Sequence, residues 1–308
     1  MNILIIGGTS LIGPHVIREL SNGSDNCVWT LTRTGRRYFC ETGLKGDRND
    51  QSTVIAALAK SQPDVIVDMI PFNAKNIESL ISACKKTRTH ARVVALSSID
   101  VYSAYGRLNN TEVAPYQPSP IYEDMALRNA FGPEGAAYDK IGVERVLLSG
   151  FEHTTLLRLP AIYGWPDTTR VEHYLEQMLC GATVISMPQD KASFRFSRCL
   201  HKNAAFAVAL AVRATTEGQR VYNIAEETAF SELEWAQRIG QCCGWKGRFE
   251  VTPWSVGIEN PRQQFEVATK AARQDLGFYE KYNVVEGLSD TVAFYGYQRL
   301  GKDYQKYY

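Results

Sequence analysis

The sequence has 308 residues, of which 44% are hydrophobic, and its formal net charge is +1 at pH 7. This length and composition are typical of one large α/β domain with an appended lobe, and they do not indicate a disordered chain. The near-neutral charge excludes a broad basic surface, so we expect no nucleic-acid partner.

The first predicted element is a strand over residues 2–6, because this unbroken, Ile-rich run is typical of a strand buried on both faces. The run ends at two glycines, and an apolar stripe at helical spacing predicts a helix after them. Unpaired N–H groups and the helix dipole at such a turn favour the pyrophosphate of a dinucleotide. An ordinary turn without a ligand is the alternative, since Ser10 replaces one glycine of the usual fingerprint. We predict cofactor contacts at Gly7, Thr9, Ser10, Leu11, Ile12 and Gly13.

Residues 27–32 form the second predicted strand, which ends at Arg33. In a dinucleotide fold an acidic residue at this point binds the adenosine ribose diol, whereas a basic one faces a 2′-phosphate. Arg33 therefore favours NADP over NAD as the cofactor, and an arginine of a solvated loop is the alternative interpretation. Asp47 follows in a short turn, where it either contacts the adenine edge or caps the helix that begins near Ser52.

Two more apolar runs, residues 64–70 and 92–98, predict strands that alternate with helices. This order specifies a right-handed, doubly wound parallel sheet of the Rossmann type, an α/β fold that binds ligands at the carboxyl ends of its strands. The residues at those ends are further site candidates: Ile70, Pro71, Phe72, Ser97 and Ser98.

Residues 104–134 are polar and rich in proline, so we predict a loop that covers the substrate end of the sheet. A helix over residues 136–148 and a strand over residues 155–160 follow. Because this strand ends at the same edge of the sheet as the others, we place three residues beside the nicotinamide. They are Pro160, Ile162 and Tyr163.

We assign residues 1–164 to a dinucleotide-binding Rossmann domain. Residues 165–308 are predicted to form mainly a smaller C-terminal α/β substrate lobe, with a return strand near residues 220–224 that joins the sheet. In this lobe Arg195 and Arg198 are candidates for binding a phosphate or carboxylate of the substrate, and solvated arginines are the alternative.

The seven cysteines are scattered and form no C-x-x-C pair, which indicates reduced, mostly buried thiols in a cytoplasmic protein. The five histidines show no metal-binding spacing, so we expect no metal site. No apolar stretch is long enough to span a membrane and no basic segment precedes the first apolar run, so we expect no membrane association.

Five motifs occur in the order in which one known family has them. They are Gly7-Gly-Thr-Ser-Leu-Ile-Gly13, Ser97-Ser-Ile-Asp-Val-Tyr102, Lys140 with Glu144, Leu157-Arg-Leu-Pro-Ala-Ile-Tyr-Gly164 and Val221-Tyr-Asn-Ile224. Over nearly the whole chain this set resembles the extended short-chain dehydrogenase/reductase superfamily, the NAD-dependent epimerase/dehydratase group. The resemblance implies a bound nicotinamide cofactor, often a nucleotide-sugar substrate, and often a homodimer through the helices around Ser79 and Lys140.

The resemblance also implies a catalytic set of a Ser or Thr, a Tyr, and a Lys four residues after the Tyr. In this set the Tyr transfers the proton, the Lys lowers the pKa of the Tyr and holds the nicotinamide ribose, and the Ser or Thr binds the reacting oxygen. Ser98 and Lys140 align with two of these positions, but the tyrosine position falls on Ala136. No Tyr-x-x-x-Lys sequence occurs anywhere in the chain.

Tyr138 is the nearest tyrosine, but on a regular helix its side chain lies about 200° from that of Lys140. One interpretation is a locally shifted helix start that still brings Tyr138 to the substrate. A second is that Asp100, Tyr102 or Tyr163 transfers the proton instead. A third gives Tyr138 a packing role only.

We therefore expect an NAD(P)-dependent oxidoreductase, epimerase or dehydratase that acts on a hydroxyl or carbonyl carbon of a small polar substrate. Its catalytic set would be non-standard. One alternative is a non-catalytic NADP(H)-binding sensor or scaffold, because Ala136 occupies the tyrosine position. Another is RNA binding, which is known for some relatives without the catalytic set, although the near-neutral charge counts against it.

Overall fold

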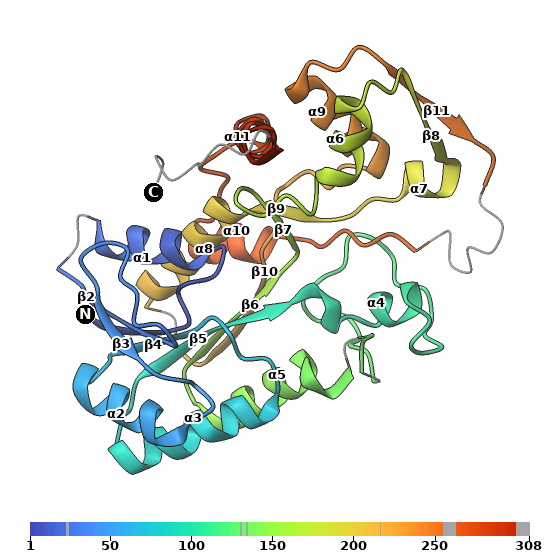
Figure 1. The fold of residues 1–308 in the computed structure, drawn as a ribbon. Helices are drawn as coiled ribbons and strands as arrows, with labels where there is room; N and C mark the ends of the chain where they lie inside the picture. Colours follow the sequence, from blue (N-terminus) through green and yellow to red (C-terminus); the bar gives the residue numbers. More distant parts are fainter. Residues whose placement is uncertain (23–24, 130, 134, 216, 255–262, 300–308) are drawn as a thin grey trace.

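The computed structural model describes the chain except residues 23–24, 130, 134, 216, 255–262 and 300–308. Its centre is a seven-stranded sheet in the order β10-β6-β5-β4-β1-β2-β3, and all neighbouring strands are parallel (Figure 1). The strands are β1 (Asn2–Ile6), β2 (Cys27–Thr32), β3 (Thr42–Lys45), β4 (Val65–Asp68), β5 (Arg92–Ser98), β6 (Thr154–Leu159) and β10 (Gln219–Asn223). The predicted Rossmann-type sheet is confirmed.

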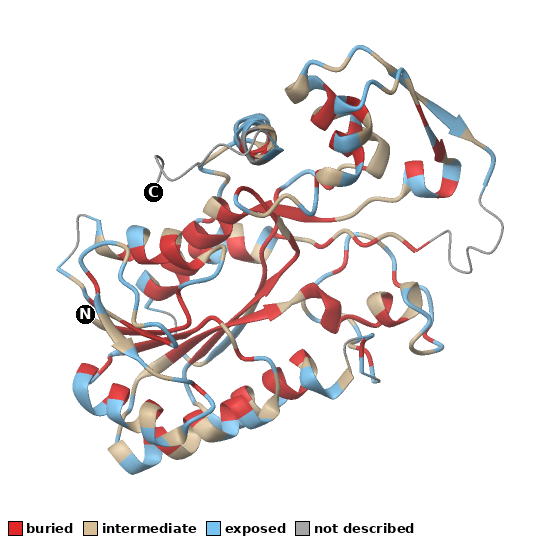
Figure 2. Ribbon diagram, viewed as in Figure 1, coloured by how far each residue is buried: buried red, intermediate tan, exposed pale blue. Residues whose placement is uncertain are grey.

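Helices cover both faces of the sheet (Figure 1). One face carries α1 (Gly13–Ser21), α8 (His201–Arg213) and α10 (Lys270–Leu276), and the other carries α2 (Gln51–Ser61), α3 (Ala74–Thr87) and α5 (Lys140–Gly150). In β1, Ile3 and Ile5 belong to the first core and Leu4 and Ile6 to the second. Successive residues of one apolar run therefore fill two separate cores, which leaves residues 3–6 of β1 fully buried (Figure 2).

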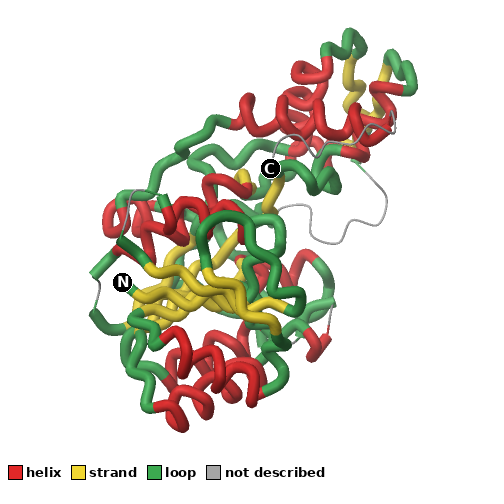
Figure 3. The backbone as a smooth tube through the Cα atoms, turned by 60° about the vertical axis from the view of Figure 1, so that its left-hand side comes forward, coloured by secondary structure: helices red, strands yellow, loops and turns green. Residues whose placement is uncertain are grey.

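A smaller lobe is built from α6 (Glu172–Leu179), β8 (Val184–Pro188), α7 (Gln189–Ser193), α9 (Glu232–Cys243), β11 (Arg248–Thr252) and α11 (Val284–Arg299). Its helices are grouped apart from the sheet (Figure 3). At its core Trp235 packs edge-on against Tyr163, with the ring centroids 4.9 Å apart. The pair β7 (Ala161–Tyr163) and β9 (Arg198–Leu200) leads from the sheet into this lobe.

The helix predicted over residues 136–148 begins later than expected. In the structure α5 starts at Lys140, because the Asp139 carboxylate caps it by accepting the Gly142 N–H at 2.9 Å. A separate 3-10 turn, Gly135–Ala137, precedes the cap. Tyr138 therefore lies in the connection before the helix, so the expected separation of about 200° on a regular helix does not apply.

Asp47 does not cap α2. The Asp50 carboxylate does so by accepting the Ser52 N–H at 2.9 Å, and the Asp47 carboxylate accepts the Asn49 N–H within its own turn. The interpretation of Asp47 as a helix cap is therefore wrong, and its contact with the adenine edge stays a prediction.

The predicted loop over residues 104–134 contains one short helix, α4 (Ser103–Leu108), and no other helix in its described part. The Gln117 side chain organises this loop: it accepts the Ala104 N–H at 2.7 Å and donates to the Ala126 carbonyl at 2.8 Å. In this loop, hydrogen bonds from a side chain thus satisfy backbone groups that regular secondary structure would pair with each other.

The expectation of mostly buried cysteines is wrong. Cys84 and Cys199 are buried, whereas Cys27, Cys40 and Cys180 are exposed because they lie at a strand start, in a loop and at a helix end. All seven are free thiols. In the described part of the chain, no helix has the length and apolar character needed to cross a membrane, and no cluster of three His, Cys, Asp or Glu side chains is placed to hold a metal ion.

Candidate active site

The turn between β1 and α1 has the backbone that a dinucleotide loop requires. Gly7 and Gly8 have φ angles of +104° and +98°, which side chains with a Cβ rarely adopt. A Cβ on Gly13 would lie 2.3 Å from the carbonyl carbon of Gly8, so only glycine lets α1 begin this close to the turn.

A cavity of about 440 Å³ opens beside this turn at the carboxyl edge of the sheet. It collects six of the predicted cofactor residues from four different segments: Gly7, Thr9, Ser10, Arg33, Asp47 and Ile70. Phe72 also lines it, whereas Leu11, Ile12, Gly13 and Pro71 do not. We call it the first cavity.

Arg48 also lines the first cavity and forms a buried ion pair that the sequence analysis missed. Its Nη1 lies 2.7 Å from Oδ1 of Asp68 at the end of β4, and it also donates to the Ile70 carbonyl at 3.0 Å. The pair therefore fixes the segment that follows β4. A signal was present, because Asp68 interrupts an apolar strand and a buried carboxylate requires a partner.

A second cavity, of about 370 Å³, lies at the carboxyl ends of β5 and β6. It brings together the candidates Ser98, Asp100 and Tyr138. Ser98 caps a short 3-10 turn, where its Oγ accepts the Asp100 N–H at 3.3 Å. The remaining lining residues are Ile99, Tyr105, Pro160, Ala161, Arg170, Phe196 and Phe265.

Lys140 is 3% exposed and lines neither cavity. Its Nζ donates to the carbonyls of Pro71 at 2.8 Å and Leu96 at 3.1 Å. Burial lowers the pKa of Lys140 to about 8, and the nearby carboxylates of Asp68 and Asp100 oppose this shift. The Lys140 Nζ lies 5.2 Å from the centre of the Tyr138 ring. The structure thus places a cation next to the tyrosine without a Tyr-x-x-x-Lys sequence.

Ser97 and Tyr102 belong to a buried polar network outside both cavities. Ser97 Oγ donates to Glu144 at 2.5 Å, and Arg158 forms an ion pair with the same carboxylate at 2.8 Å. The Tyr102 hydroxyl donates to Asn223 at 2.7 Å and accepts from Arg158 at 2.9 Å. Burial also raises the pKa of Tyr102 to about 12, and because Tyr102 does not line the second cavity we do not place it in the proton-transfer set. The Ser97 side chain is likewise turned away from the first cavity.

The three candidate residues that follow β6 lie in three different environments. Pro160 lines the second cavity, Ile162 is half-buried, and Tyr163 is fully buried with its hydroxyl donating to Glu226 at 2.8 Å. Tyr163 thus lines neither cavity, and burial raises the pKa of its hydroxyl far above its usual range, so we do not place it in the proton-transfer set.

Arg195 and Arg198, the predicted anion-binding residues, do not line the second cavity. They form ion pairs with Glu234 and Glu232, respectively, and the second cavity holds Arg170 in their place. The sequence analysis missed Arg170, Tyr105, Phe196 and Phe265, because Tyr105 lies on the short helix α4, the other three lie in connections, and none carries a local motif. Only the tertiary fold brings them to the strand ends.

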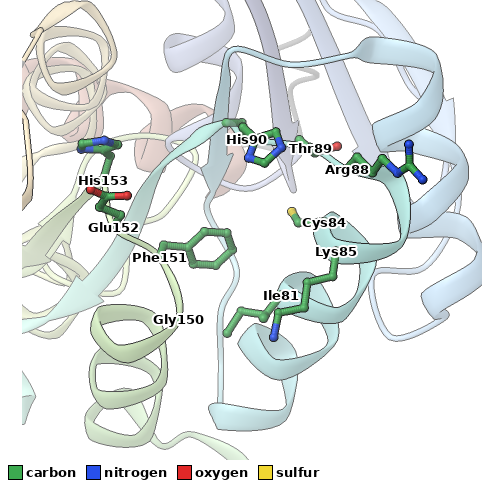
Figure 4. A pocket seen from close by; sticks show the side chains of 11 residues that line it. Ile81, Cys84, Lys85, Arg88, Thr89, His90, Gly150, Phe151, Glu152 and His153 are labelled. Carbon is green, nitrogen blue, oxygen red and sulfur yellow. The ribbon is translucent and has the colours of Figure 1, made fainter.

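A hollow of about 650 Å³, larger than either cavity, lies at the opposite, amino edge of the sheet (Figure 4). It lies between the C-terminal ends of α3 and α5, and the ring of Phe151 and the sulfur of Cys84 point into it. It contains none of the predicted site residues. Size alone therefore does not locate the site, since parallel sheets bind ligands at the carboxyl edge.

With this geometry in view, a comparison with known families is decisive. Residues 3–225 match the model of the NAD dependent epimerase/dehydratase family. The chain belongs to this family. The resemblance drawn from the ordered motifs is confirmed, and the family match includes every segment that lines the first cavity.

Individual members of the family are distant from this chain. The chloroplast stem-loop binding protein of 41 kDa b from Arabidopsis thaliana is 23% identical over 319 residues, covering 94% of this chain and 78% of that protein. A UDP-glucose 4-epimerase from Stenotrophomonas maltophila, solved with NAD and formylated UDP-arabinopyranose, has a TM-score of 0.74 at 18% identity, covering 98% of this chain and 99% of that one. MoeE5, solved with UDP-glucuronic acid and NAD, has a TM-score of 0.71 at 19% identity, covering 97% and 100%. These structures share the fold.

Proposed function

We propose that this protein is an NAD(P)-dependent enzyme that acts on a hydroxyl or carbonyl carbon of a small polar substrate. One observation carries the proposal. Ser98, Asp100 and Tyr138, from two separate segments, line one cavity at the carboxyl edge of the sheet, and the Lys140 ammonium lies 5.2 Å from the Tyr138 ring. A hydroxyl, a carboxyl and a phenol beside a buried cation are a sufficient set for proton transfer.

In this proposal Tyr138 transfers the proton and Ser98 donates a hydrogen bond to the reacting oxygen. The Lys140 ammonium stabilises the negative charge that forms on the Tyr138 oxygen. Two of its three N–H groups are held by backbone carbonyls, which leaves one for the nicotinamide ribose. The nicotinamide, when bound, supplies the acceptor or donor of a hydride.

We further propose that the substrate is a sugar or a nucleotide sugar. Arg170 provides a cation for a phosphate, and the aromatic rings of Tyr105, Phe196 and Phe265 provide flat apolar surface in the same cavity. The two structures above were solved with UDP-sugars, which supports this choice. Incubating the purified protein with NAD(P) and UDP-glucose or UDP-glucuronic acid, and following product by chromatography, tests the proposal. No turnover of any sugar nucleotide, or unchanged turnover after Ser98→Ala, would contradict it.

Arg33 should select the cofactor. Its position at the end of β2, in the lining of the first cavity, suits the 2′-phosphate of NADP. A charge-assisted hydrogen bond contributes about 1.5–3 kcal/mol, so Arg33→Ala should weaken NADPH binding by about tenfold or more and leave NADH binding nearly unchanged. Calorimetric titration with both cofactors measures this. Equal effects on both would leave NAD, with which both structures above were solved, as the proposed cofactor.

Activity should fall on the alkaline side of pH 8. The pKa of Lys140 is lowered to about 8, so the ammonium loses its proton as the pH rises through that value. A neutral amine no longer stabilises the charge on the Tyr138 oxygen, and kcat therefore decreases. A pH profile at saturating substrate checks this, and Lys140→Arg, which stays charged, should abolish the decrease. A profile that is flat to pH 10 in the unmodified protein would refute the role of Lys140.

Stem-loop RNA binding is a second candidate. It is favoured by the likeness to the Arabidopsis thaliana stem-loop binding protein and by the absence of a Tyr-x-x-x-Lys sequence. Gel shifts with a stem-loop RNA at increasing salt distinguish the two candidates, because binding through phosphates weakens steeply with salt. RNA binding together with no cofactor binding would favour the second candidate.

A further inference from the structure

An aromatic pair connects the two cavities. Phe72, which follows β4, lines the first cavity and is 45% exposed. Tyr138, which precedes α5, lines the second. Their ring centroids lie 6.3 Å apart with the planes tilted by 40°, so each ring is the direct neighbour of the other.

The Lys140 ammonium supports this pair. Its Nζ lies 5.6 Å from the centre of the Phe72 ring and 5.2 Å from that of Tyr138, within the range of cation–π attraction to both. The ammonium itself is immobilised by the carbonyls of Pro71 and Leu96. The Tyr138 ring therefore lies against both a fixed cation and Phe72.

The backbone joins the same two segments. The Asp139 N–H donates to the Phe72 carbonyl at 2.7 Å, and Asn73 Nδ2 reaches the Ala137 carbonyl at 3.5 Å. On its other side, the Phe72 N–H donates to Asn76 Oδ1 at 2.9 Å in the first turn of α3. The Phe72 backbone is thus held in place, and its half-exposed side chain faces the first cavity.

We propose that Phe72 is a positioning residue that couples occupancy of the first cavity to Tyr138 in the second. A dinucleotide bound in the first cavity covers the exposed face of the Phe72 ring, and the covered ring holds Tyr138 against the Lys140 ammonium. The coupling rests on the proposed function, since it requires a dinucleotide in the first cavity. Phe72 would then act on the proposed proton donor, Tyr138, from the first cavity.

Nitration of tyrosines by tetranitromethane, mapped by peptide mass spectrometry, tests the coupling without any assay of turnover. In the unmodified protein, saturating NADPH or NADH should slow nitration of Tyr138 by about fivefold or more. Phe72→Ala should abolish this protection, and Phe72→Tyr, which keeps the ring, should restore it. The exposed Tyr279 serves as the internal reference for reagent access. Each variant is measured at a cofactor concentration that saturates it by calorimetry, so weaker binding does not imitate lost coupling.

Phe39→Ala is the matched control. Phe39 is also 45% exposed, and it lines neither cavity, so its removal should leave the protection of Tyr138 intact. If NADPH and NADH bind and protect Tyr138 equally in the unmodified protein and in Phe72→Ala, the cofactor shields Tyr138 directly and the coupling is refuted while the proposed function stands. If neither cofactor binds, the proposed function fails and the coupling fails with it.

Discussion

Replacing Tyr138 by phenylalanine should lower kcat by about 10²- to 10⁴-fold, the usual contribution of a positioned proton donor. The change removes one oxygen atom from the second cavity and keeps the ring that packs on Lys140 and Phe72. KM should therefore change little, because the substrate still meets the same apolar surface. Steady-state kinetics with a sugar nucleotide that the unmodified protein turns over measures both constants.

Tyr102→Phe separates this assignment from its main competitor. Tyr102 is buried, and its hydroxyl bonds Arg158 and Asn223, so the substitution should lower the melting temperature rather than act on the chemistry. If Tyr102→Phe abolished turnover in a fully folded protein and Tyr138→Phe did not, the proton donor would have been assigned to the wrong tyrosine.

Replacing Glu144 by leucine should lower the free energy of unfolding by about 3–5 kcal/mol. The Arg158 guanidinium would lose its two hydrogen bonds to the carboxylate and the Ser97 hydroxyl would lose its acceptor, so the buried cation would remain without its ion-pair partner. The loss is large because the pair joins α5 to β6 where water cannot replace the carboxylate. Urea unfolding followed by circular dichroism measures it.

Asp290→Asn is the control for that measurement. Asp290 pairs with Lys202 at 3.0 Å, but its side chain is 50% exposed, so its loss should cost about 0–1 kcal/mol. Equal losses for the two variants would show that burial does not set the strength of the Arg158–Glu144 pair.

The sheet could be predicted because its signals are local. The run before Gly7 is apolar at every position, and such a run requires cover on both faces whatever the rest of the chain does. The start of α5 was harder to predict, because Ala136 and Ala137 are good helix formers. It is decided by one carboxylate, that of Asp139, which caps the helix four residues later than composition suggests.

The site was predictable only where strands end. Ser98 and Arg33 were found because they follow predicted strands, and the fold carries all strand ends to one edge. Arg170 and Phe265 reach the second cavity from far along the chain, and nothing in their sequence neighbourhoods marks them. The partnership of Arg48 with Asp68 likewise depends on tertiary contact between two turns. Such pairings follow from packing, which a single sequence does not display.

The edge position of β10 has a consequence for how the chain is made. β10 pairs with β6 across more than sixty residues, and it is the last strand of the sheet to be synthesised. Until residues 219–223 leave the ribosome, the apolar strand β6 presents an unpaired edge that can recruit another chain. The nascent protein therefore passes through an interval in which it is prone to aggregation, and that interval closes only when its seventh strand arrives.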